Sequence, residues 1–171
     1  MALSLGLPFV ANANDHLKPV NGFNRDMKQV DISKIDHEMF KVNFIYLIIA
    51  NSIEECDKTA PKTSKKIART GIQLFQENPE WPKTLDKTKL LWEEVNPLTN
   101  NSGNLNEVQI NTLNMIASLT VLLGGNSLKL TDRQCSAFLQ NIQDRPNQKL
   151  YWNNYIEKAI PVIIDTTQWR N

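Results

Sequence analysis

The chain has 171 residues, of which 41% are hydrophobic, and its 19 Lys+Arg residues nearly balance 18 Asp+Glu residues to give a formal net charge of +1. A chain of this length buries about two thirds of its unfolded surface, enough for one domain that folds without a metal or a dense disulfide framework. The balanced charge argues against nucleic acid as a partner, and no apolar stretch reaches the roughly 18 to 20 residues of a membrane span.

Residues 1–13 read MALSLGLPFVANA, an apolar run that ends in Ala11-Asn12-Ala13. This small-x-small ending is the pattern that signal peptidase accepts, so the sequence predicts a signal peptide cleaved after Ala13. A periplasmic or secreted protein would follow. Signal peptides normally begin with a positive charge, whereas no Lys or Arg precedes Lys18, so an ordinary apolar tail is the alternative.

A polar arm at residues 14–32 separates the predicted signal peptide from a helical domain at residues 33–171. Apolar residues at spacings of three and four predict a long helix from Ser33 onward, whose buried stripe ends at Cys56. The apolar stripe is wide enough to place this helix at the centre of a bundle, with neighbours on several sides. Its members are Ile35, Met39, Val42, Ile45, Ile49, Ile53 and Cys56, widened by Phe40, Phe44, Leu47 and Ile48.

Two shorter helices follow, and each is opened by a proline. Thr59-Ala60-Pro61 ends the long helix and starts the second, because proline fits the first turn of a helix. Gly71 in the second helix predicts a close crossing with a neighbouring helix. Asn78-Pro79 stops the second helix, and Pro82 opens a third that ends before Asn96-Pro97.

Three further helices are expected after a polar loop at residues 96–106. The fourth ends at Gly124-Gly125, which supply the positive φ of a C-cap. Thr131 and Gln134 form a Thr-x-x-Gln capping box that opens the fifth. Apolar residues within 150–159 predict a sixth, so we expect an all-α, compact bundle of about six helices.

Cys56 and Cys135 are the two cysteines of the chain. An even number of cysteines in a chain with a predicted signal peptide favours one disulfide. It would close a loop of about 80 residues and stabilise the fold by roughly 4 kcal/mol on the chain-entropy model. Two buried free thiols are the main alternative, and a catalytic thiolate lacks a paired histidine.

Motifs for catalysis are missing from the sequence: it has no phosphate-binding loop, zinc-protease motif or nucleophile elbow. His37 and Glu38 are adjacent on a helix, point about 100° apart and cannot act as a dyad. We interpret the pairs Glu54-Glu55 and Glu93-Glu94 as solvated faces for the same reason. The expectation is therefore no enzyme activity, no metal and no cofactor, while a hydrolase with carboxylates drawn from separate helices stays open.

Large amphipathic side chains and one loop are the candidate contacts with a protein partner. Trp81, Trp152 and Trp169 lie outside the strongest apolar stripes, and exposed tryptophans anchor interfaces. The alternative is that these rings seal the ends of the bundle. Asn100 and Asn101 lie in the polar loop expected between the third and fourth helices. Such a loop can enter a partner's cleft, and the alternative is that it only connects the two helices.

Several of these features together resemble small, all-helical, exported bacterial proteins. They are the Ala-x-Ala ending, the segment Cys56-Asp-Lys-Thr-Ala-Pro61, the helix end from Phe75 to Asn78-Pro79-Glu80-Trp81, and Cys135 at the start of a later helix. Among such proteins the chain is similar to the periplasmic immunity proteins that protect bacteria from peptidoglycan-cleaving effectors of type VI secretion.

The resemblance implies a protein that inhibits a secreted effector enzyme. Our hypothesis for the mechanism is occlusion, in which a loop or an aromatic edge of a rigid helical body blocks the active cleft of the enzyme. The resemblance assigns no inhibitory residue, because no inhibitory motif of that family matches residue by residue. A periplasmic structural or chaperone-like accessory protein is the alternative function.

Overall fold

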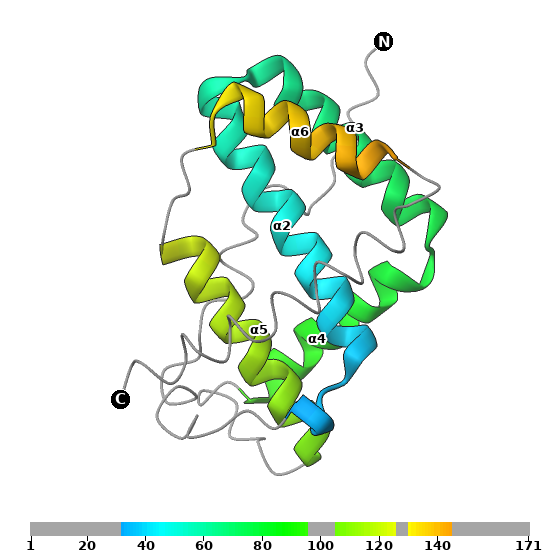
Figure 1. The fold of residues 1–171 in the computed structure, drawn as a ribbon. Helices are drawn as coiled ribbons and strands as arrows, with labels where there is room; N and C mark the ends of the chain where they lie inside the picture. Colours follow the sequence, from blue (N-terminus) through cyan, green and yellow to red (C-terminus); the bar gives the residue numbers. More distant parts are fainter. Residues whose placement is uncertain (1–31, 96–104, 126–129, 145–171) are drawn as a thin grey trace.

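The computed structural model describes residues 32–95, 105–125 and 130–144 (Figure 1). These residues form five α-helices and one short 3-10 helix, rather than the expected six or so α-helices. The sixth predicted helix at 150–159, the signal peptide at 1–13 and most of the polar arm lie outside the described residues. In chain order the elements are η1 (Ile32–Lys34), α2 (His37–Thr59), α3 (Pro61–Glu77), α4 (Glu80–Val95), α5 (Glu107–Gly125) and α6 (Asp132–Gln143).

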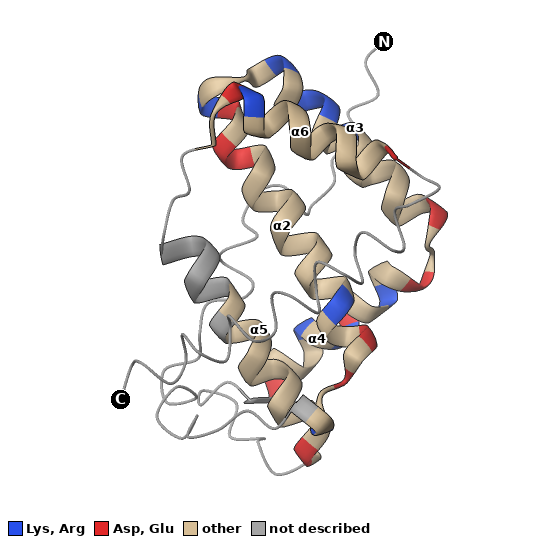
Figure 2. Cartoon of the chain, in the orientation of Figure 1, with Lys and Arg blue, Asp and Glu red and all other residues tan. Residues whose placement is uncertain are grey.

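Helix α2 is the central element, as its wide apolar stripe predicted. It begins at His37, and the carboxylate of the N-cap residue Asp36 accepts a hydrogen bond of 2.9 Å from the backbone N–H of Met39. No charged residue occurs between Lys41 and Glu54, so the middle of the helix is free of charge (Figure 2). This apolar middle lets α3, α4, α5 and α6 all pack against α2.

Two hydrophobic clusters share α2. The first surrounds Phe40 and Phe44 and includes residues of α4 and α5. The second surrounds Ile45 and Cys56 and includes residues of α3, α4 and α6. Because partly buried hydrophobic residues of α2 pack against both clusters, the helix joins them into one core.

Helices α2 and α3 approach closely at Gly71. A Cβ atom added there would lie 2.9 Å from Cγ2 of Ile49, closer than side-chain atoms can pack. Nearer the start of α3, the buried hydroxyl of Ser64 donates a hydrogen bond of 2.9 Å to the carbonyl oxygen of Ile53. The close crossing expected from the glycine is therefore confirmed.

Local sequence signals set most of the helix boundaries. Pro61 is the first residue of α3, and α5 ends at Gly125 as predicted. The capping box of α6 is present, with Gln134 N–H donating to Thr131 Oγ1 at 3.3 Å and Thr131 N–H donating to Gln134 Oε1 at 2.9 Å. Helix α4 begins two residues before Pro82, since Trp81 N–H already donates to the carbonyl of Asn78.

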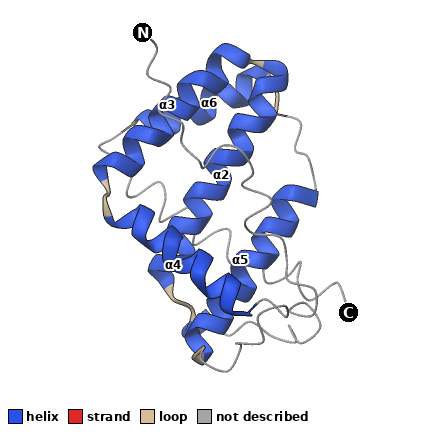
Figure 3. Ribbon diagram, turned by 180° about the vertical axis from the view of Figure 1, so that it is seen from behind, coloured by secondary structure: helices blue, strands red, loops and turns tan. Residues whose placement is uncertain are grey.

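The described residues contain helices, turns and loops and no β-strand, which agrees with the all-α prediction (Figure 3). None of the helices among them is long and apolar enough to cross a membrane.

Candidate functional site

Cys56 and Cys135 form a disulfide, as predicted from their number and positions. The Cα atoms lie 5.9 Å apart, and the bond joins residues 79 positions apart in sequence. Both cysteines are fully buried within the second hydrophobic cluster. The disulfide ties the end of α2 to the start of α6.

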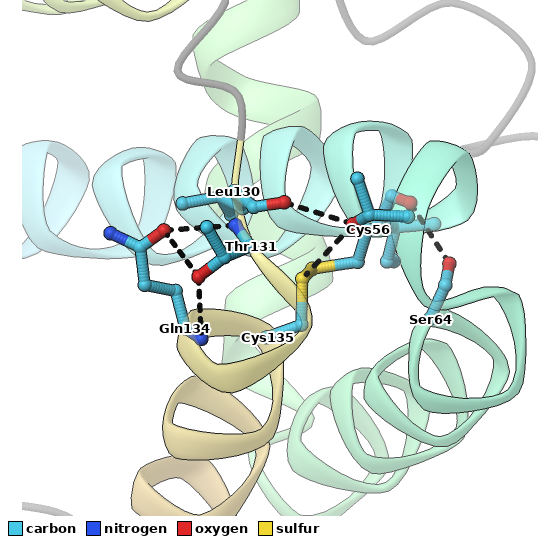
Figure 4. The surroundings of a disulfide bond; sticks show 8 residues. Cys56, Ser64, Leu130, Thr131, Gln134 and Cys135 are labelled. Carbon is cyan, nitrogen blue, oxygen red and sulfur yellow. Dashed lines mark hydrogen bonds between the residues drawn. A yellow bond between two sulfur atoms is a disulfide. The ribbon is translucent and has the colours of Figure 1, made fainter.

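Hydrogen bonds surround this disulfide and fix the same junction (Figure 4). The hydroxyl of Thr59 donates to the carbonyl oxygen of Leu130 at 2.9 Å and lies 4.0 Å from Sγ of Cys135. The capping box at Thr131 follows directly. We call these residues the disulfide corner, comprising Cys56, Thr59, Leu130, Thr131, Gln134 and Cys135.

Trp81, one of the predicted contact residues, belongs to the core. Its side chain is 9% exposed, and its ring meets Phe75 edge-on with the centroids 5.3 Å apart. Phe75 in turn lies 6.2 Å from the ring of Tyr46, whose pKa is raised by burial. This burial favours the alternative in which the ring seals the bundle, so Trp81 is not an exposed anchor.

The other predicted contact residues are Asn100, Asn101, Trp152 and Trp169. All four lie outside the described residues, and their role as partner contacts stays a prediction.

The candidate catalytic groups do not converge within the described residues. His37 is exposed at the first position of α2, and its neighbour Glu38 pairs with Lys41 at 3.8 Å. Glu93 and Glu94 are exposed, as expected. The described ranges also contain no group of three or more His, Cys, Asp or Glu side chains that could hold a metal ion.

Glu55 is buried, whereas the sequence predicted that it lies on a solvated face. Its side chain is only 4% exposed, whereas that of its neighbour Glu54 is exposed. Glu55 accepts a hydrogen bond of 2.6 Å from the ammonium group of Lys58, one turn later on α2. This hydrogen bond, made to the charged form of the lysine, raises the pKa of Lys58.

A buried polar pair that the sequence did not predict links α2 to α4. The amide nitrogen of Asn43 donates to Thr88 Oγ1 and to the carbonyl oxygen of Met39, both at 2.8 Å. The hydroxyl of Thr88 donates to the carbonyl oxygen of Thr84 at 2.9 Å. The only available signal was a polar residue inside the apolar run of α2, which gives no information about its partner.

Two polar contacts attach α5 to the chain that leads into α2. Lys34 of η1 pairs with Glu107 at 2.6 Å, and the backbone N–H of Asp36 donates to the buried hydroxyl of Thr112. These contacts hold the first turns of α5 beside the start of α2. The polar loop that carries Asn100 and Asn101 therefore connects two helices that are each packed on α2.

Comparisons with protein-family models, with curated proteins and with solved structures find no match for this chain.

Proposed function

We propose that the chain is an exported helical protein that binds another protein. In its specific form, the proposal is an immunity protein that occludes the active site of a cell-wall-targeting effector. The observation that supports export is the disulfide between Cys56 and Cys135. Disulfides persist in oxidising compartments such as the bacterial periplasm and are rare in the cytosol. The predicted cleavage after Ala13 points to the same compartment.

The framework of the domain suits a binding role. The disulfide corner, the close crossing at Gly71 and the hydrogen bond from Ser64 hold α2, α3 and α6 together. A surface that is already ordered loses little conformational entropy when it binds, so more of the contact energy goes into affinity. A rigid body of this kind can block a cleft without being cleaved or remodelled.

The test is isolation of the tagged full chain from cells that carry its native locus, with intact mass measured before and after reduction. We expect one partner in equal amount, with hydrolase activity, bound to a chain that begins at Asn14. Reduction should add the mass of the two thiol hydrogens. An uncleaved, fully reduced chain without a partner would contradict the proposal.

The accessory function remains the second candidate, because some apolar surface is exposed. Leu90 on α4 is 59% exposed, and Val108 and Ile110 on α5 are also exposed. Scattered apolar groups favour broad, weak contacts with several clients. Micromolar binding to unrelated proteins would support this role, whereas one complex of nanomolar affinity would support the inhibitor.

A further inference from the structure

The outer face of α3 concentrates positive charge. Lys62, Lys65, Lys66 and Arg69 are spaced so that they lie on one side of the helix, and all four are exposed. They span about 10 Å along the helix axis. No Asp or Glu occurs between Pro61 and Gln76, so nothing on this part of the helix offsets them. We call these four residues the α3 basic face.

Most other lysines that the structure describes form an ion pair with a carboxylate, and these four cations form none with the described residues. Pairs within one helix join Lys41 to Glu38, Lys58 to Glu55, Lys83 to Glu80 and Lys89 to Glu93. Across the described ranges, no member of the α3 basic face makes an ion pair. The charge of this face is therefore available to an external group.

The stability of α3 does not explain why four cations lie on this face. The N-terminal end of a helix is the positive end of its dipole, where cations are unfavourable and acidic residues are favoured. Helix α3 has no acidic residue in its first turn, and its N-cap Ala60 makes no side-chain hydrogen bond. Like charges three and four residues apart also repel. The local electrostatics therefore weaken α3, and its buried face must hold it in place.

The buried face of α3 supplies that support. Ser64, Ile67, Gly71 and Leu74 face the core, where they pack beside α2. The disulfide corner fixes the adjoining start of α6, which also packs on α3. The four cations are thus displayed on a helix whose position is fixed before any partner arrives.

We propose that the α3 basic face is a contact surface for an acidic patch on a partner protein. This inference rests on the proposed function and names the chemistry of the partner's side of the interface. Electrostatic complementarity of this kind speeds association and selects the partner.

Acidic groups beside the α3 basic face favour a protein over a uniformly anionic surface. Asp57 and Glu54 are exposed near the end of α2, which joins α3 through the single residue Ala60. Asp132 is exposed at the start of α6, three residues before Cys135, which the disulfide links to α2. Figure 2 shows basic and acidic segments gathered at this end of the molecule. A lipid bilayer or a nucleic-acid duplex would repel these carboxylates, whereas a protein surface can carry charges of both signs.

The exposed positions of α3 also carry no large apolar side chain that could insert into a membrane. The large apolar side chains that the structure exposes within its described residues lie on α4 and α5. Helices that bind the membrane interface combine a basic face with apolar residues that enter the acyl region. Helix α3 offers the charge alone, which again suits an acidic protein surface.

The first test uses the full-length, isotopically labelled chain and poly-L-glutamate as the probe. We expect NMR shifts centred on the amides of residues 62–69, reversed by added salt because exposed charges are screened. Vesicles rich in phosphatidylglycerol and a DNA duplex are run in parallel. Tighter binding to either of these than to poly-L-glutamate, or shifts spread evenly over all lysine-bearing helices, would overturn the inference.

Two matched triple variants locate the contact. One is Lys62→Gln/Lys65→Gln/Lys66→Gln on α3, and the control is Lys83→Gln/Lys87→Gln/Lys89→Gln on α4, where all three lysines are also exposed. Both remove the same charge and retain good helix formers. The α3 variant should lose about 3-fold to 150-fold in affinity for poly-L-glutamate, from the usual range for exposed ion pairs, while the α4 control changes by less than about 3-fold. Equal losses in the two variants would overturn the inference.

The partner recovered in the isolation experiment provides the second test. It is titrated against the wild type and both triple variants, and the α3 variant should bind more weakly than the control. Unchanged affinity of the α3 variant would overturn the inference and leave the proposed function intact. Failure to recover any partner would contradict the proposed function, and the poly-L-glutamate experiment would still decide the chemistry of the surface.

Discussion

Removal of the disulfide should destabilise the domain by several kcal/mol. The bond closes a loop across 79 positions, and the chain-entropy relation gives about 4.5 kcal/mol for a loop of that length at 25 °C. For a chain of this size, 1 kcal/mol corresponds to about 2 to 4 °C in Tm. We therefore expect Cys56→Ala/Cys135→Ala to lower Tm by about 9 to 18 °C.

Thermal unfolding followed by circular dichroism measures this effect on three samples: oxidised wild type, reduced wild type and the double variant. Because the cysteines are fully buried, the double variant also loses the packing of two sulfur atoms, and reduced wild type isolates the effect of the bond. We expect reduced wild type to account for most of the loss. A decrease in Tm of less than about 3 °C on reduction would refute the claim that the bond restrains the unfolded chain.

Three further substitutions test the packing and the caps. Gly71→Ala places a methyl group 2.9 Å from Ile49 Cγ2 and should destabilise the protein by about 1 to 3 kcal/mol, although alanine is the better helix former. In an Ile49→Ala background the same change should be neutral or stabilising. Denaturant unfolding of the wild type, the two single variants and the double variant measures both effects. Asn43→Ala removes the 2.8 Å hydrogen bond to Thr88 and leaves a cavity, so urea titration should show a loss of about 1 to 3 kcal/mol, whereas an unchanged midpoint would mean that the pair contributes nothing. Thr131→Ala removes the N-cap of α6 and should lower the free energy of unfolding by about 1 kcal/mol. Relative to the wild type, amide hydrogen exchange should become faster in α6 by a larger factor than in α5. An equal increase in both helices would contradict a local capping role.

Features set by neighbours in the sequence were predictable. Proline in the first turn of α3, glycine at the end of α5 and the Thr131 capping box all act through local backbone chemistry, so the sequence reveals them directly. The width of the apolar stripe also placed α2 at the centre. Gly71 belongs with these features, since a glycine inside an amphipathic helix indicates a close approach.

Features set by tertiary packing were not predictable. Glu54 and Glu55 have the same chemistry and adjacent positions, yet only Glu55 is buried, because neighbours along a helix point about 100° apart. Trp81 was predicted as a contact residue because it lies outside the strongest apolar stripes, but Phe75 and the core enclose its ring. The bond between Asn43 and Thr88 depends on how α4 crosses α2, and periodicity does not contain that information.

The α3 basic face also combines a feature that the sequence reveals with features that only the tertiary structure reveals. The spacing of Lys62, Lys65, Lys66 and Arg69 is readable in the sequence, but the proposal of a contact surface is not. The proposal rests on two structural observations: most other lysines that the structure describes pair with carboxylates, and the opposite face of α3 packs against the core.

We propose that this chain inhibits a secreted effector by binding over its active site. The most direct measurement is the peptidoglycan-cleaving activity of the isolated partner while the purified, oxidised chain is added. We expect activity to fall in proportion to the chain added and to be abolished at one chain per enzyme. A partner that is saturated with the chain and still cleaves peptidoglycan at its full rate would contradict the proposal.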